Sequence, residues 1–425
     1  MFSILIFLCL CLGACRHGNN VSNSSGLELQ VKAEPMLISQ LGNEHFGNAV
    51  YRRGINGPSI AASGSRILEW QVQQFAPTME VVPASAGNYQ NGACVIDINN
   101  NNVDEMIVGR SSGDLTTDLL WFEEIAGQSH WKEHFIASVS KEKGAEGLHD
   151  IMPFEAKISG KMVQGVVVLA NRNILYWYEI PDDFAQPWKE HKIADLKKYG
   201  AECAQSGLVT GDIAGNGRQD IVCGNFWAEC PADPTVDSWE IHRYSNWDIR
   251  TTPVFPGVPT WVNDTRFGGM NQLDLGDMNS DGMVDIVATD AEIPEARVGV
   301  FCRDMNDPRS LWNVILIDTG LYCPHSLVVT DVNADSRPDI IIGEMTAGGW
   351  MFPGNSDPKL YLYLNQGNLK FEKYVLHSGW GIHMMRMASH KADNKTFIFG
   401  ADEIQPWYED MTTHVVGWTI HLPDL

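Results

Sequence analysis

Residues 277–289 read DMNSDGMVDIVAT, an Asp-rich turn followed by a short run of β-branched and small apolar residues. Side-chain oxygens occupy its first, third, fifth and ninth positions, on Asp277, Asn279, Asp281 and Asp285. The run from Asp285 to Thr289 has the composition and length of a buried strand. We therefore expect two strands joined by this turn.

The same pattern recurs along the chain at intervals of 54 to 65 residues. Further copies read DINNNNVDEMIVG (97–109), DIAGNGRQDIVCG (212–224) and DVNADSRPDIIIG (331–343), and degenerate copies begin at Glu155 and Ser389. A regular interval of this size indicates a repeat architecture.

Each unit also carries an aromatic third segment, near Trp70, Trp121, Trp177, Trp239, Phe301, Tyr361 and Trp418. A short fourth segment follows in every unit except the last, and there the stretch WKEH occurs twice, at 131–134 and 188–191. A Glu beside a His suggests acid/base chemistry, but the equivalent stretches at 312–315 and 371–374 lack the His. We therefore interpret WKEH as part of an outer strand, with Trp packed between units and Lys and Glu in water.

Four short strands per unit, repeated seven times, predict an all-β fold: a seven-bladed β-propeller of four-stranded antiparallel blades. Residues 27–425 are expected to form this single domain. The last unit supplies three strands only, and residues 27–38 have β character without a unit of their own. We expect residues 27–38 to pair beside the strand at Trp418, which closes the ring and leaves no open sheet edge.

The Asp-rich turn followed by a hydrophobic strand and Gly resembles the FG-GAP/VCBS repeat family. That resemblance implies a propeller on a cell surface or in a secreted protein, and it leaves function open because the family has adhesive, scaffold and enzymatic members. The W-(F/Y)-E…W-x-x-H-x-I segments at 121–136 and 177–193 are also loosely similar to propellers related to the dehydratase that acts on aldos-2-uloses.

The first fifteen residues, MFSILIFLCLCLGAC, resemble a bacterial lipoprotein signal peptide whose lipobox Cys15 is acylated after cleavage. A plain cleaved signal peptide is the alternative, since no Lys or Arg precedes the apolar run. Residues 16–26 are rich in Asn and Ser and are expected to form a flexible tether. The predicted location is extracytoplasmic, in the periplasm or on the outer surface, with membrane attachment through the lipid anchor only.

The formal net charge of −23 argues against nucleic acid and anionic membrane surfaces as partners. It suits a protein that binds cations. No Gly-rich phosphate loop, Ser-centred elbow or HExxH motif is present, so the enzyme classes that depend on them have no support.

Three histidines are expected at one repeat-equivalent position, at the start of the innermost strands and on the face opposite the Asp-rich turns. Counting six residues back from each turn gives Asn91, His149, Ser206, Asn271, His325 and His383. They are candidate proton carriers, or ligands of a divalent metal, at the mouth of the central channel. The alternative is that each polar side chain hydrogen-bonds the backbone of a neighbouring blade. Arg386 is a candidate for stabilising the enolate of an acidic sugar during an elimination.

Long loops between second and third strands are expected on the same face, and they are rich in acids and aromatics. Exposed aromatic rings beside carboxylates suit a sugar ring and its hydroxyls. The candidate substrate-binding residues are Trp227, Glu229, Glu344, Trp350, Trp407 and Tyr408. Packing beneath the loops is the alternative explanation for any one of these aromatic rings.

The Asp-rich turns are candidate Ca²⁺ sites because oxygen clusters of this kind suit that ion. The fullest sets of oxygen-bearing side chains are Asp277, Asn279, Asp281 and Asp285, and Asp331, Asn333, Asp335 and Asp339. Alternatively, the first and last Asp cap the turn through backbone NH groups without any ion.

Two classes of function follow from these features. The first is a carbohydrate-active enzyme, a polysaccharide lyase or sugar dehydratase that works at the histidine-bearing face. The second is a non-catalytic surface propeller that binds a glycan or a protein partner.

Overall fold

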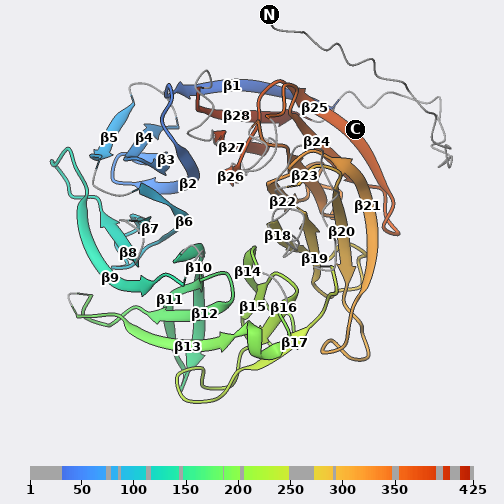
Figure 1. Ribbon diagram of the computed structural model, residues 1–425, viewed down its shortest axis with the longest axis horizontal. Helices are drawn as coiled ribbons and strands as arrows, with labels where there is room; N and C mark the ends of the chain where they lie inside the picture. Colours follow the sequence, from blue (N-terminus) through green and yellow to red (C-terminus); the bar gives the residue numbers. More distant parts are fainter. Residues whose placement is uncertain are drawn as a thin grey trace, which may run out of the picture.

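The computed structural model describes residues 31–72, 78–84, 88–111, 116–142, 147–184, 186–201, 205–247, 272–290, 293–346, 354–388, 396–402 and 412–421. Its strands form seven four-stranded antiparallel sheets around a central axis, so the predicted seven-bladed β-propeller is confirmed (Figure 1). The described residues also include a short 3-10 helix, Leu196–Tyr199. None of the described residues forms a helix that is long and apolar enough to cross a membrane.

In six of the blades the strands follow chain order from the centre outward. The innermost strands are β2 (Phe46–Gly54), β6 (Asn88–Ile96), β10 (Leu148–Ile158), β14 (Leu208–Gly211), β18 (Gln272–Gly276), β22 (Ser326–Thr330) and β26 (Met384–Ala388). The second strands are β3 (Gly57–Gly64), β7 (Glu105–Ser111), β11 (Lys161–Ala170), β15 (Asp220–Cys223), β19 (Asp285–Thr289), β23 (Asp339–Gly343) and β27 (Thr396–Asp402).

The third strands are β4 (Ile67–Gln71), β8 (Thr116–Glu123), β12 (Ile174–Glu179), β16 (Phe226–Glu229), β20 (Ala296–Cys302), β24 (Lys359–Asn365) and β28 (His414–His421). The outer strands are β5 (Met79–Val82), β9 (Lys132–Ser140), β13 (Lys189–Asp195), β17 (Glu240–Arg243), β21 (Asn313–Leu321), β25 (Phe371–Ser378) and β1 (Lys32–Gln40). Blades one to seven are numbered below from the one that contains β2.

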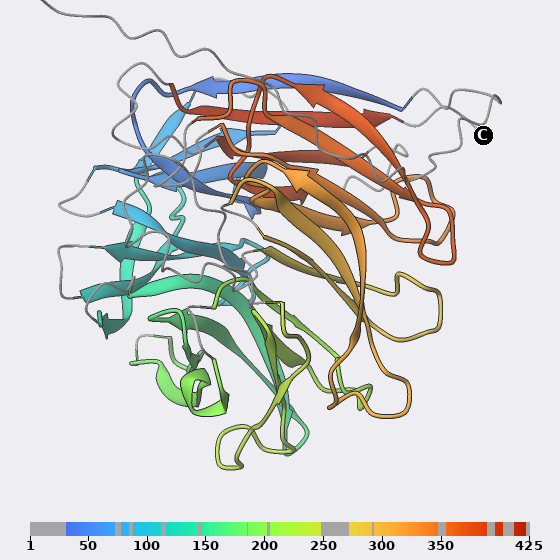
Figure 2. The same cartoon turned by 45° about the vertical axis from the view of Figure 1, so that its right-hand side comes forward.

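The ring is closed by the first described strand, β1, as predicted, while residues 27–30 of the predicted segment lie outside the described residues. β1 is the outer strand of blade seven and pairs antiparallel with β28, with Pro35 opposite Trp418 (Figures 1 and 2). Proline suits this place because an outer strand has one side without ladder hydrogen bonds. Strands from both ends of the chain thus share one sheet, and β28 has a neighbour on each side.

The Asp-rich turns join first and second strands, and their sequence follows from their backbone. The fourth and sixth residues of each turn have positive φ: Asn100 and Asn102, Gly215 and Gly217, Ser280 and Gly282, and Ala334 and Ser336. Gly and Asn adopt this left-handed conformation at least cost, which explains their frequency in the turns.

The hydrophobic core lies between blades. The cluster between blades two and three, for example, contains Ile107 and Trp121 of one sheet together with Val166 and Val168 of the next. Five fully buried tryptophans lie on third strands: Trp70, Trp121, Trp177, Trp227 and Trp418. Trp131 and Trp188 of the two WKEH stretches are also buried, while the Lys and Glu that follow them are exposed, as expected for outer strands.

The two ends of the blades carry different groups. We call the end with the turns at Asp97, Asp212, Asp277 and Asp331 the Asp-turn face. The opposite end, where His325 and His383 directly precede β22 and β26, is called the histidine face.

Blade four corrects the sequence analysis. The aromatic third segment was expected near Trp239, but the third strand is β16, which contains Trp227. The segment after Trp239 is the outer strand β17. The connection between the second and third strands is therefore only Gly224 and Asn225, and the long connection lies between the third and fourth strands.

Candidate functional site: the central channel

The innermost strands of all seven blades surround a cavity of about 500 Å³. Its lining is mostly apolar side chains and backbone, with a few polar groups, which is typical of a pocket for a small organic ligand. The ionisable side chains in the lining are Tyr51, Cys94, Asp150, Asp274 and Arg386. Each lies on or beside a first strand, so the repeat itself brings them together.

Arg386 is the cation of this channel. Its Nη1 donates a hydrogen bond to the carbonyl oxygen of Met385 at 3.0 Å. Among the described residues, no carboxylate oxygen lies within 4.0 Å of its guanidinium nitrogens. Burial lowers the pKa of Arg386, while the charges of Asp150 and Asp274 act in the opposite direction. The guanidinium therefore lines the cavity near two carboxylates without an ion pair to either.

Both carboxylates are held by backbone NH groups. Asp274 accepts hydrogen bonds from the NH of Leu275 at 2.8 Å and of Val329, in the next blade, at 2.7 Å. Burial nevertheless raises the pKa of Asp274 to about 6. Asp150 accepts from the NH of Gly207, again in the next blade, at 3.1 Å.

His149 interacts with Asp150, its neighbour in the sequence. Its Nδ1 lies 2.7 Å from a carboxylate oxygen of Asp150. Burial raises the pKa of Asp150, but the charge and hydrogen bond of His149, the charge of Arg172 and the hydrogen bond from the NH of Gly207 together lower it below its usual value.

His325 and His383 are the two histidines that the structure brings together. Their rings are stacked with centroids 4.1 Å apart. Nδ1 of His325 lies 2.9 Å from the carbonyl oxygen of His383, and Nδ1 of His383 lies 2.8 Å from that of Gly47 in blade one. Each histidine thus bonds the backbone of the next blade, which is the alternative to a role as proton carrier or metal ligand.

The candidate sugar-binding residues are spread over different environments. Glu344 follows β23 as expected, but it is buried and accepts hydrogen bonds from the NH groups of Tyr322 and Lys359. Trp227 was expected in an exposed loop and is instead buried in β16. Glu229, at the end of β16, lies at the Asp-turn face, where Asn216 of the Asp212 turn is 3.5 Å away. Other predicted positions lie outside the described residues: Cys15, Trp350, Trp407 and Tyr408.

The predicted Ca²⁺ ligands make hydrogen bonds to the backbone of their own turns. The carboxylate of Asp277 accepts from the NH of Asp281 at 3.0 Å and of Gly282 at 2.8 Å. Asp331 accepts in the same way from Asp335 and Ser336, while the side-chain oxygens of Asn279 and Asn333 accept from the NH groups of Asp281 and Asp335. Turn capping therefore accounts for these side chains in the structure as it stands, and a Ca²⁺ site stays a prediction.

The ninth residue of each turn connects the turn to the end of the third strand. Asp285 accepts hydrogen bonds from the NH of Met278 in the turn and of Arg303 after β20. Asp220 and Asp339 repeat this pair of bonds, and Glu105 makes the bond to its turn through Ile98. Burial raises the pKa of Glu105 to about 7 and those of the three aspartates to about 6. We call Glu105, Asp220, Asp285 and Asp339 the position-nine carboxylates.

A repeated Trp–His–Glu arrangement on the third and fourth strands was missed by the sequence analysis. In blades two, three and four the Trp ring packs on the ring of the His opposite it: Trp121 on His134, Trp177 on His191, and Trp227 on His242. Nε2 of each His faces a Glu two residues beyond the Trp: Glu123, Glu179 or Glu229. The signal was present as W-x-E in the third strand and His in the fourth.

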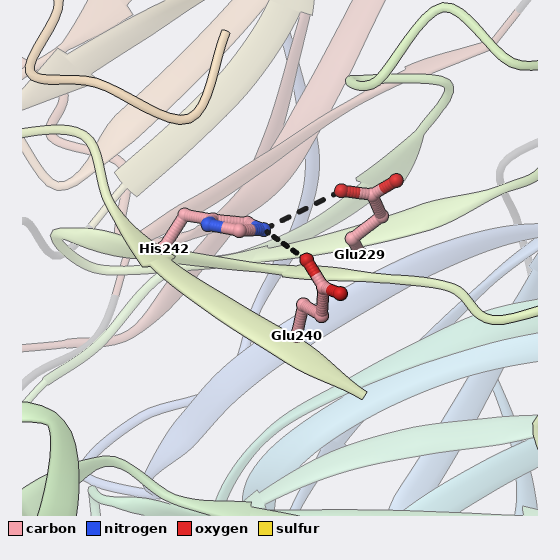
Figure 3. A group of neighbouring side chains, drawn as sticks. All are labelled: Glu229, Glu240 and His242. Atoms are coloured by element: carbon pink, nitrogen blue, oxygen red, sulfur yellow. Dashed lines mark ion pairs between the residues drawn. The ribbon is translucent and has the colours of Figure 1, made fainter. Parts of the chain in front are cut away.

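The blade-four copy also contains Glu240. Among the described residues, Glu229, Glu240 and His242 form one group of three side chains of types that can bind a metal, and their candidate ligand atoms all lie within 4.8 Å of one another (Figure 3).

Comparisons with known proteins add no relative. No family model matches the chain, and its sequence matches no curated protein.

Proposed function

We propose that the protein is an exported carbohydrate-active protein that takes an acidic sugar into the central channel from the histidine face. The observation that carries the proposal is Arg386, a channel-lining guanidinium without an ion pair to any described carboxylate. A guanidinium in a site of low dielectric is well suited to a carboxylate, which it binds through two parallel hydrogen bonds. The cavity of about 500 Å³ falls in the size range of small-ligand sites.

The activity that we propose first is an elimination, as in a polysaccharide lyase or sugar dehydratase. A base removes the proton next to the sugar carboxylate, a cation stabilises the enolate, and the departing oxygen takes a proton as its bond to carbon breaks. Arg386 suits the role of the cation. Asp274, with its pKa raised to about 6, suits the role of the base, because proton carriers work best with a pKa near the working pH.

The second candidate is a non-catalytic propeller that binds a glycan or a protein partner. It is favoured by the fixed partners of the polar groups near the channel. Asp274 accepts hydrogen bonds from two backbone NH groups, and Nδ1 of both His325 and His383 is hydrogen-bonded to a backbone carbonyl oxygen. Side chains held in this way form a rigid frame, which suits binding without turnover.

The two candidates are separated by incubating the mature protein with uronate-containing and neutral oligosaccharides, with and without chelator. Binding is measured by calorimetry, and elimination by the ultraviolet absorbance of the unsaturated product. We expect the uronates to bind and Arg386→Met to abolish the binding, whereas Lys161→Met, which removes an exposed positive charge at the Asp-turn face, leaves it unchanged. Product formation supports the enzyme, and binding without product supports the second candidate. Equal binding by Arg386→Met and the unchanged protein would overturn the proposed site.

We also propose that the chain is anchored in the membrane through a lipid on Cys15. Support comes from the apolar run that ends in Leu12-Gly13-Ala14-Cys15. Mass spectrometry of the N-terminal peptide tests this directly: a diacylglyceryl group is expected on Cys15, and Cys15→Ser should release the protein from the membrane fraction. An unmodified N-terminus would instead indicate an ordinary signal peptide.

A further inference from the structure

The outer strand of blade four differs from those of blades two and three at one charged position. Lys132 lies opposite Glu123, and Lys189 lies opposite Glu179, so in both blades the cross-strand partner of the glutamate is a lysine. In blade four the residue opposite Glu229 is Glu240. The same frame therefore carries a second carboxylate where the other two blades carry a cation.

The His–Glu contact changes along with this position. Nε2 of His134 and of His191 lies 2.9 Å from its glutamate, which is a hydrogen bond. In blade four, Nε2 of His242 lies 3.4 Å from Glu229 and 3.8 Å from Glu240. This nitrogen is buried and has no hydrogen-bond partner, although it points between the two carboxylates (Figure 3). A buried polar atom without a partner is costly, so its position calls for an explanation.

The spacing suits three ligands of one small cation. Zn²⁺ binds His nitrogen and carboxylate oxygen at about 2.0–2.2 Å, so neighbouring ligands of a tetrahedral ion lie about 3.3 Å apart. The 3.4 Å separation between His242 and Glu229 matches that edge, and the 3.8 Å separation exceeds it by a few tenths of an ångström. Glu240, with its side chain 70% exposed, is able to make that adjustment.

The charges around the group also favour a divalent cation. Arg309, from the loop between β20 and β21, donates to both oxygens of Glu229 at 3.0 and 2.9 Å and lies 3.9 Å from Glu240. The positive charge of Arg309 therefore balances only one of the two carboxylate charges. Burial lowers the pKa of His242, and the neutral imidazole is the form that binds a metal.

We propose that Glu229, Glu240 and His242 form a binding site for a divalent transition-metal ion, with Zn²⁺ as the ion to test. Imidazole nitrogen together with two carboxylates favours Zn²⁺ over Ca²⁺ and Mg²⁺, which prefer ligand sets made only of oxygens. The three protein ligands leave a fourth position for water. The site lies on the third and outer strands of blade four at the Asp-turn face, away from the central channel, and is independent of the proposed sugar site.

The test titrates Zn²⁺ into the chelator-treated mature protein by calorimetry and follows the melting temperature. Glu240→Lys is the informative variant because it restores the residue type that blades two and three carry at this place. Glu372→Lys makes the same change of charge at an exposed position of another outer strand, β25, and serves as control. We expect the unchanged protein and Glu372→Lys to bind one more Zn²⁺ than Glu240→Lys, or to bind it at least ten-fold more tightly. Zn²⁺ should raise the melting temperature of these two proteins but not of Glu240→Lys.

His242→Gln provides a second variant with a spectroscopic readout. Co²⁺ in place of Zn²⁺ should give visible absorption bands in the unchanged protein, and these should be lost in both His242→Gln and Glu240→Lys. Equal stoichiometry and affinity for Zn²⁺ in the unchanged protein and Glu240→Lys would overturn the proposal, as would tighter binding of Ca²⁺ than of Zn²⁺ at this site.

Discussion

The imidazole of His325 is stacked on that of His383, at an angle of 23° between the ring planes. Nδ1 of His325 also lies 2.9 Å from the backbone carbonyl oxygen of His383. His383 makes the equivalent bond to Gly47. Two consecutive blade interfaces, six to seven and seven to one, are therefore joined by one type of hydrogen bond at the histidine face. The second of these is the interface between the last blade and the first.

Replacing either histidine should weaken the ring. His325→Ala and His383→Ala each remove a donor and leave a carbonyl oxygen without its partner, at a cost of about 1–3 kcal/mol in the free energy of unfolding. Urea denaturation of the single variants measures this loss, and His130→Ala, at an exposed position, serves as control. If both histidines are dispensable for stability while their removal abolishes a sugar-dependent activity, their proposed place in the frame is wrong.

The sequence could place these histidines but could not reveal their partners. The repeat interval puts His149, His325 and His383 at equivalent positions, and the structure has each at the start of a first strand or directly before it. The carbonyl that accepts from His325 belongs to a residue 58 positions further along the chain. Whether a side chain contacts that backbone or turns into the channel depends on the approach of two blades, which a single repeat does not encode.

Blade four shows a second limit of sequence analysis. Two aromatic residues, Trp227 and Trp239, are both candidates for the third strand of this blade. The length of the repeat does not decide between them, because it is the same whether the long connection precedes or follows the third strand. The structure gives the third-strand position to Trp227, which is completely buried between blades. Trp227 and its neighbour Glu229, which were predicted in an exposed loop at the histidine face, therefore do not lie there. The repeat thus predicted the fold well, and its loops poorly.

The position-nine carboxylates should make stability depend on pH. Their pKa values are raised to about 6 for Asp220, Asp285 and Asp339 and to about 7 for Glu105, so between pH 4 and these values the folded state binds more protons than the unfolded state. Their contribution is fully present below about pH 4 and is lost as the pH rises through 6 to 7. For one aspartate the elevation corresponds to at most about 3 kcal/mol.

The contribution is isolated by comparing the unchanged protein with Asp339→Asn at several pH values. The variant has no proton to lose at this place, so its free energy of unfolding should fall less between pH 5 and pH 8 than that of the unchanged protein. The slope is the informative quantity, because Asn also disturbs the two backbone hydrogen bonds at every pH. Parallel curves for the two proteins would contradict the raised pKa.

Calcium binding in the Asp277 turn is tested by the exposed residue of that turn rather than by the buried one. Asp281→Ala removes a predicted ligand. Among the described residues, the side chain of Asp281 accepts one backbone hydrogen bond, from the NH of Met283. If the turn binds Ca²⁺, this variant should lower the melting temperature in calcium and change little in chelator. Asp285→Ala should cost about 2–3 kcal/mol in both conditions, because it leaves the buried NH groups of Met278 and Arg303 without a partner. An equal small loss for Asp281→Ala with and without calcium would leave turn capping as the whole explanation.

The closing strand gives the last prediction. β28 carries Trp418, which is completely buried, and β1 covers its outer edge from Lys32 opposite His421 to Gln40 opposite His414. A variant that lacks residues 1–40 would expose the backbone NH and carbonyl groups of β28 as an open edge, and open edges pair with other chains. We expect this variant to aggregate or to melt at a much lower temperature than a variant that begins at Val31. Size-exclusion chromatography and thermal denaturation compare the two. A monomeric protein with unchanged melting temperature after removal of residues 1–40 would show that six complete blades and three strands hold the ring without β1.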